Sequence, residues 1–88
     1  MTAAPPTTVR DPREIIREEP LMRRRILDTM SEGGRTVPEI AAAIASPEHE
    51  TLLWVMAMRR YGYVREIKTG AEDGYFRYGQ GPRAKDAR

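Results

Sequence analysis

Residues whose types allow acid–base chemistry lie together at positions 48–50, where His49 stands between Glu48 and Glu50. Acidic residues in the first turn of a helix stabilise its dipole by about 0.3–1 kcal/mol, and we expect this structural role for both glutamates. The chain has one histidine and no cysteine. A single imidazole cannot make a metal site of the usual kind, so we interpret His49 as a solvated side chain with no bound metal.

Other groupings that would carry catalysis are absent from the sequence. Apart from the neighbours at 48–50, it contains no nucleophile motif, no histidine–carboxylate pair and no glycine loop that would hold a phosphate. We therefore predict that the protein is not an enzyme, with no catalytic residue and no cofactor.

The composition restricts the chain to one small globular domain. It has 88 residues, of which 40% are hydrophobic and 32% charged, with a formal net charge of +2. The longest apolar run is the stretch from Leu52 to Met58, far short of the ~20 residues of a membrane span. The first residues have no apolar segment typical of a signal peptide, and the absence of cysteine fits a cytoplasmic location.

Capping signals and periodicity predict the elements that position these residues. Asp11-Pro12 opens a short helical turn, and longer helices are expected over about 20–32, 37–45 and 47–61, the second from a Thr36–Glu39 capping box and the third after a Ser46-Pro47 cap. Gly62 ends the third helix. Strands follow at 63–68 and 75–78, with a hairpin loop within 69–74. We predict disordered tails over 1–11 and 79–88, the latter basic, and one domain over 12–78.

The order of these elements resembles the winged helix-turn-helix. The stretch RRRILDTMSEGGRTVPEIAAAI is similar to the first two helices of winged-helix regulators of the broad MarR and ArsR type. MRRYGYVRE resembles the end of their recognition helix and its step into the wing, and YFRY resembles the returning wing strand. The resemblance covers about residues 20–78. It implies a mainly α fold with a small β-hairpin, namely a three-helix bundle plus a wing.

In this resemblance the helix at 47–61 is the recognition helix, whose N-terminal half faces the major groove of double-stranded DNA. His49 would approach the bases. The residues that would contact phosphate are Arg59, Arg60, Arg65, Lys68 and Arg77. The arginine run at 23–25 is expected to be solvated.

The same helix carries an unusual number of apolar residues. At about 100° per residue, the side expected to face the core is formed by Thr51, Val55 and Met58, with Trp54 as an anchor beside them. The opposite side carries Leu52, Leu53 and Met56. Small monomers rarely expose such a patch. We therefore expect a cover made by a second copy of the chain (a homodimer), by the chain's own Ile15 and Ile16, or by another protein.

Two functions follow. The fold and the basic residues favour a small DNA-binding transcriptional regulator. The alternative is a protein-interaction or accessory module that uses the apolar outer face of its third helix. Leucine and methionine cannot read base edges by hydrogen bonds, and the wing tip Ala71-Glu72-Asp73 is acidic; both features favour the alternative.

Overall fold

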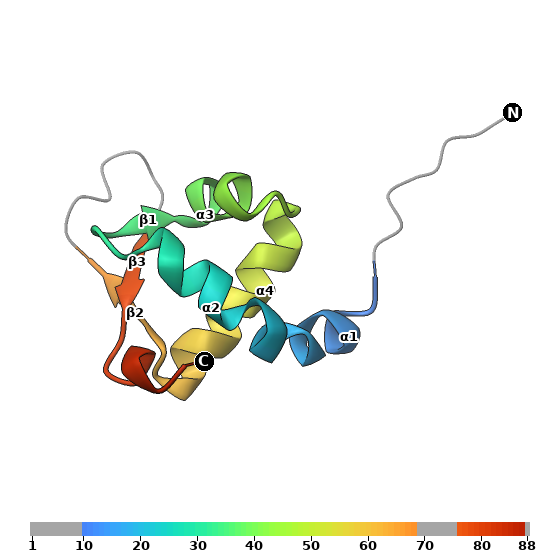
Figure 1. Ribbon diagram of the computed structural model, residues 1–88. Coiled ribbons are helices and arrows are strands. Elements are labelled where there is room, and N and C mark those ends of the chain that lie inside the picture. Colours follow the sequence, from blue (N-terminus) through green and yellow to red (C-terminus); the bar gives the residue numbers. More distant parts are fainter. Residues whose placement is uncertain (1–9, 69–75, 88) are drawn as a thin grey trace, which may run out of the picture.

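The computed structural model describes residues 10–68 and 76–87, which form a winged-helix-like arrangement of helices and a small sheet (Figure 1). The helices are α1 (Pro12–Arg17), α2 (Glu19–Thr29), α3 (Val37–Ile44) and α4 (Glu48–Tyr61). Strands β1 (Arg35–Thr36), β2 (Val64–Ile67) and β3 (Arg77–Gln80) make an antiparallel sheet of order β1-β3-β2, and a 3₁₀ turn, η1 (Ala84–Asp86), follows. The predicted fold class is confirmed.

Local hydrogen bonds fix the starts of the helices. The Asp11 side chain accepts from the backbone N–H of Arg13 and so caps α1. Thr36 and Glu39 form the predicted capping box: the Thr36 N–H donates to Glu39 Oε1 (2.8 Å), and the Glu39 N–H donates to Thr36 Oγ1 (3.3 Å). Bonding to the Thr36 N–H also holds the pKa of the Glu39 carboxyl below its ordinary value. Such caps contribute about 1 kcal/mol.

The start of α4 differs from the sequence prediction. Ser46 does not cap it, because its hydroxyl donates to the carbonyl of Ile44 (3.5 Å). Pro47 is the N-cap residue, and no side chain caps this end. Thr51 Oγ1 instead donates to the Pro47 carbonyl (2.9 Å). The other end agrees with the prediction, since Gly62 takes a left-handed φ of 89°.

The core lies around α4, which packs against α1, α2, α3 and β2 (Figure 1). The side predicted to face inward is buried: Thr51, Val55 and Met58 are fully enclosed. Trp54 is 3% exposed, and its indole Nε1–H donates to the Ile15 carbonyl at 2.7 Å. The prediction that Trp54 is a core residue is confirmed, and this bond holds α1 to α4.

The sheet is shifted from its predicted position. β2 and β3 occupy 64–67 and 77–80 instead of 63–68 and 75–78, and the two-residue β1 was not predicted. β1 pairs with β3 through Arg35↔Tyr78 and Thr36↔Arg77. The predicted hairpin loop at 69–74, the acidic tip and the first nine residues of the N-terminal tail lie outside the described residues.

The predicted disordered tail over 79–88 is wrong for residues 79–87. Gly79 and Gln80 belong to β3. The following turn is held by backbone bonds, because the Gly81 N–H donates to the Tyr63 carbonyl (2.8 Å) and the Arg83 N–H to the Gly62 carbonyl (2.9 Å). These bonds need no apolar side chains, so hydrophobic patterning gave no signal for them. In the described part of the chain, no helix is long and apolar enough to cross a membrane.

Candidate functional site

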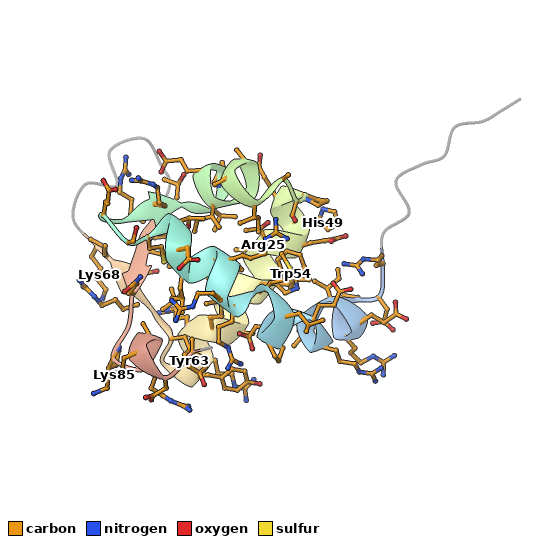
Figure 2. The ribbon with its side chains drawn as sticks, in the orientation of Figure 1. Arg25, His49, Trp54, Tyr63, Lys68 and Lys85 are labelled. Carbon is orange, nitrogen blue, oxygen red and sulfur yellow. The ribbon has the colours of Figure 1, made fainter. Side chains whose placement is uncertain are left out.

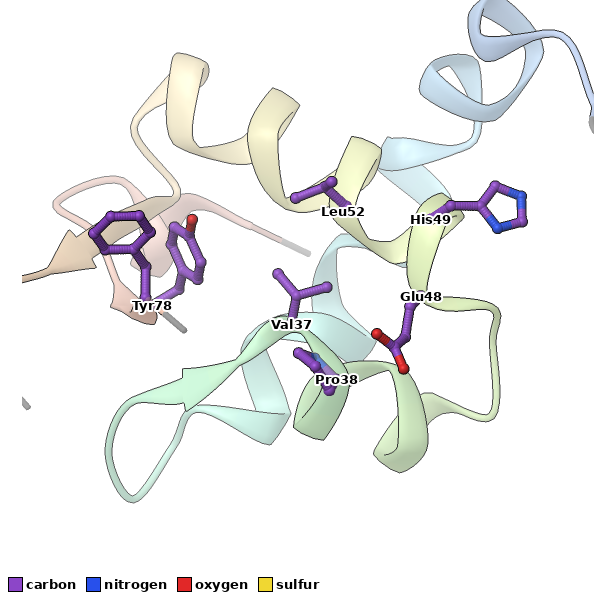
Figure 3. Close-up of a pocket in the computed structure, with 7 residues that line it drawn as sticks. Val37, Pro38, Glu48, His49, Leu52 and Tyr78 are labelled. Atoms are coloured by element: carbon purple, nitrogen blue, oxygen red, sulfur yellow. The ribbon is translucent and has the colours of Figure 1, made fainter. Parts of the chain in front are cut away.

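An apolar hollow of about 430 Å³ opens between α3, α4 and the sheet (Figure 3). Its size lies within the range of small ligand pockets. Three segments that are far apart in the sequence line it, with the side chains Val37, Pro38, Glu48, His49, Leu52, Phe76 and Tyr78. Most of this lining is apolar, so the hollow suits an apolar side chain better than a charged group.

Local structure explains how the residues that line the hollow are positioned. The Thr36–Glu39 capping box sets the first turn of α3, which presents Val37 and Pro38. Phe76 and Tyr78 are two residues apart, and alternation along an extended strand places them on the same side. Tyr78 is buried, and this burial, with the charge of Glu66 beside it, raises the pKa of its hydroxyl.

Two large apolar side chains remain open to solvent at the hollow. Leu52 is 43% exposed and Phe76 is 55% exposed. The other two residues predicted for a protein interface, Leu53 and Met56, are half-buried and pack against the core. The exposed apolar surface on this side of α4 is therefore narrower than the sequence suggested, and it continues onto the sheet.

The basic residues predicted to contact DNA do not share one face. Arg59, Arg60, Arg65 and Lys68 are exposed, and Arg77 is half-buried. Alternation along β3 puts Arg77 on the side opposite Tyr78, and the pairing Arg65↔Gly79 puts Arg65 on that same side. Figure 2 shows His49 and Lys68 at opposite sides of the molecule. A single duplex lying along α4 would meet only part of this set.

Glu50, in the first turn of α4, belongs to an ion-pair cluster that includes Arg10. His49 Nε2 lies 3.9 Å from Glu50 Oε2. The Glu50 carboxylate is already bound by Arg10, whose Nη2 and Nε donate to it at 2.7 and 3.1 Å. Arg10 also donates to both oxygens of Glu18 at 2.8 Å. Among the residues that the structure describes, no group of three or more His, Asp or Glu side chains is placed to hold a metal.

A second polar cluster was missed by the sequence analysis. Glu19 is 2% exposed, and Arg23 donates to both of its carboxylate oxygens at 2.6 Å. The Arg23 guanidinium also lies 4.0 Å from the centre of the Tyr63 ring, against which Arg83 packs as well at 4.7 Å. The i,i+4 spacing of Glu19 and Arg23 was the available signal. This cluster is satisfied internally and joins α2 to the C-terminal turn.

Arg24 and Arg25 are exposed, as expected for the run at 23–25, but each also donates a hydrogen bond to a backbone carbonyl. Arg24 Nη2 donates to the Ala87 carbonyl (2.9 Å), and Arg25 Nη2 donates to the Ile44 carbonyl (3.0 Å). Ile44 is the last residue of α3 and Ala87 follows η1, so both carbonyls lie at helix C-termini, where they lack an intrahelical hydrogen-bond donor. The arginine run therefore ties α2 to its neighbours.

Comparison with known proteins gives the fold and no function. No family model matches the sequence, and no curated protein matches it. A solved structure of human N-acetylserotonin methyltransferase, in complex with SAM, superposes with a TM-score of 0.60 at 17% sequence identity. The match covers 85% of this chain but only 21% of that chain. At this identity the likeness concerns the fold alone, so the methyltransferase activity is not carried over.

Proposed function

We propose that this chain is a protein-interaction module that uses the outer face of its winged-helix-like fold as an apolar docking surface. The observation that carries the proposal is the hollow between α3, α4 and β3, with Leu52 and Phe76 exposed beside it. In the winged-helix resemblance, the outer side of α4 is the side that would read base edges. Here that side offers few hydrogen-bond donors.

The energetics favour a protein partner over a duplex. Covering a large apolar side chain stabilises a complex by about 1.5–3 kcal/mol relative to leaving it in water. Base readout instead needs bidentate donors or acceptors aimed into the groove. The exposed Glu48 carboxylate on the first turn would repel phosphate. A polar rim around an apolar centre is the usual composition of a protein interface.

The test compares two kinds of binding by the same protein. In dilute solution, the dye ANS should bind the wild type and lose affinity in Leu52→Ser, whereas the control Leu21→Ser on α2 should behave as wild type. Mixed-sequence duplex DNA should show no binding at physiological salt. Duplex binding that falls steeply with salt, with ANS binding insensitive to Leu52→Ser, would refute the proposal.

DNA binding is the second candidate function, and the exposed Arg59, Arg60, Arg65 and Lys68 support it. Each phosphate contact contributes about one unit to the slope of log affinity against log salt. If the wing contacts DNA, the double variant Arg65→Ala, Lys68→Ala should lower this slope by about 2 units. Fluorescence anisotropy of a labelled duplex measures the slope. An unchanged slope would exclude the wing as a contact.

A further inference from the structure

We propose that the partner of the docking surface is a second copy of this chain, which lays its α4 antiparallel across α4 of the first copy about a twofold axis. This inference rests on the proposed function, since it names the occupant of the same face. The evidence is the distribution of charge and apolar surface along one stripe of α4, together with the exposed side chains beside the hollow.

The stripe consists of Glu48, Leu52, Met56 and Arg59. At 3.6 residues per turn these four residues lie within roughly 80° of one another, along about 16 Å of helix. Glu48, Leu52 and Arg59 are exposed, and Met56 is half-buried. The stripe is therefore acidic at its start, apolar in the middle and basic at its end. Such a pattern is complementary to itself when reversed.

The two end charges are available for an intermolecular contact. Within residues 10–68 and 76–87, neither Glu48 nor Arg59 has an ion-pair partner. Glu50, in the same first turn, is held by Arg10. The helix dipole explains the signs of the charges at both ends of α4. It does not explain why Leu52, midway between them, is exposed beside an apolar hollow.

Twofold symmetry turns this pattern into a closed interface. In an antiparallel pair, Glu48 of each copy faces Arg59 of the other, and Leu52 faces Met56 of the other. Each contact occurs twice because the interface is isologous. The second helix would also cover Phe76, which borders the hollow from the sheet side.

Another arrangement uses Leu21 on α2, which at 79% is the most exposed large apolar residue in the described part of the chain. If Leu21 of one copy filled the hollow of the next, the contact would be heterologous and would build rings or open filaments instead of a twofold dimer. The charge pattern of α4 has no part in that arrangement. The two arrangements therefore differ in their response to substitutions on α2 and on α4.

The experiment is sedimentation equilibrium of the full chain over a range of concentrations. The wild type should show a reversible monomer–dimer equilibrium. Leu52→Ser removes an apolar contact from both halves of the interface and should weaken the dimer by about 100-fold. Leu21→Ser, the matched control, should leave the dimer unchanged.

Charge reversal tests the antiparallel register directly. Glu48→Arg alone makes both ends of the α4 stripe basic, and Arg59→Glu alone makes both ends acidic. Two copies of the same variant then repel each other at both ends of the interface, so each variant should be monomeric. Mixed together they should form a heterodimer, because the basic stripe of one copy faces the acidic stripe of the other. Circular dichroism of each variant checks that α4 stays folded, and the mixture needs no doubly changed chain.

Three results would overturn the inference. They are a wild type that is monomeric at every concentration, dissociation by Leu21→Ser, and folded charge variants that do not associate when mixed. A monomeric wild type that still binds ANS through Leu52 would refute the second copy as partner and leave the proposed function standing. A monomer that binds no ANS at this face would refute both.

Discussion

Replacement of Trp54 by phenylalanine should destabilise the protein moderately, through the loss of one hydrogen bond and the opening of a small cavity. The indole is buried and donates to the Ile15 carbonyl at 2.7 Å. That carbonyl also accepts from the Glu18 N–H at 3.0 Å, so it keeps one partner when the indole is removed. The lost bond should therefore cost only the net value of a hydrogen bond, about 0.5–1.5 kcal/mol. The smaller ring leaves a cavity that adds roughly 1 kcal/mol.

Trp54→Ala removes the whole anchor and should cost about 3–5 kcal/mol. A domain of this size is stabilised by only roughly 4–13 kcal/mol, so this variant should be close to unfolding. Urea unfolding followed by circular dichroism gives both values, and Tyr61→Phe at an exposed aromatic serves as the control. If Trp54→Phe matched the wild type, the bond to α1 would contribute nothing. A Trp54→Ala variant with the thermal stability of the wild type would refute the role of Trp54 as a core anchor.

Two further predictions concern acid stability and one close backbone approach. Hydrogen bonds from Arg10 hold the pKa of Glu18 below its ordinary value. The stabilisation from this ion pair is fully present above the pKa of glutamate in the unfolded chain, about 4.3. It is lost as the pH falls through the lower pKa of Glu18 in the folded protein. Arg10→Ala should therefore flatten the acid decline in urea stability, and an equally steep decline would contradict the role of the ion pair. A Cβ added at Gly81 would lie 2.6 Å from the Gly62 carbonyl oxygen, a backbone atom, whereas the closest atom to one at Gly34 would be the end of the Ile67 side chain at 2.8 Å. Gly81→Ala should thus cost more than Gly34→Ala, by about 1–3 kcal/mol in thermal unfolding, and the reverse order would show that the turn after β3 adjusts freely.

Local signals were sufficient to predict that the helices exist but not all of their ends, since Ser46 does not cap α4 and α2 ends at Thr29 instead of at residue 32. The Thr36–Glu39 box and Gly62 are each read from a few neighbouring residues, and the structure has both. β1 could not be found in this way, because two residues have no periodicity and their pairing with β3 depends on the tertiary fold. The C-terminal turn was missed for a related reason, since backbone bonds to Gly62 and Tyr63 hold it.

The candidate site was only partly predictable. The apolar outer side of α4 was visible at helical spacing, and Leu52 is exposed there. The hollow needed three segments brought together, and nothing in the spacing of Val37, Leu52 and Phe76 indicates that they meet. The register of β2 against β3 likewise places Arg65 and Arg77 on the side of the sheet opposite Tyr78. A shift of one residue in that register would place Arg65 on the same side as Tyr78, and the sequence does not fix the register.

The strand order β1-β3-β2 has a consequence for the folding pathway. β2 and β3 are successive strands. β1, however, pairs with β3, and α3, α4 and β2 lie between these two strands in the sequence. Closing such a long loop costs conformational entropy. The two paired residues of β1 make few contacts to offset that cost. The β1–β3 ladder should therefore form after the rate-limiting step, with φ-values near zero for substitutions at Arg35, which pairs with Tyr78 and does not cap α3, and higher values for those in α4. Loss of that ladder should accordingly speed unfolding while leaving the folding rate almost unchanged.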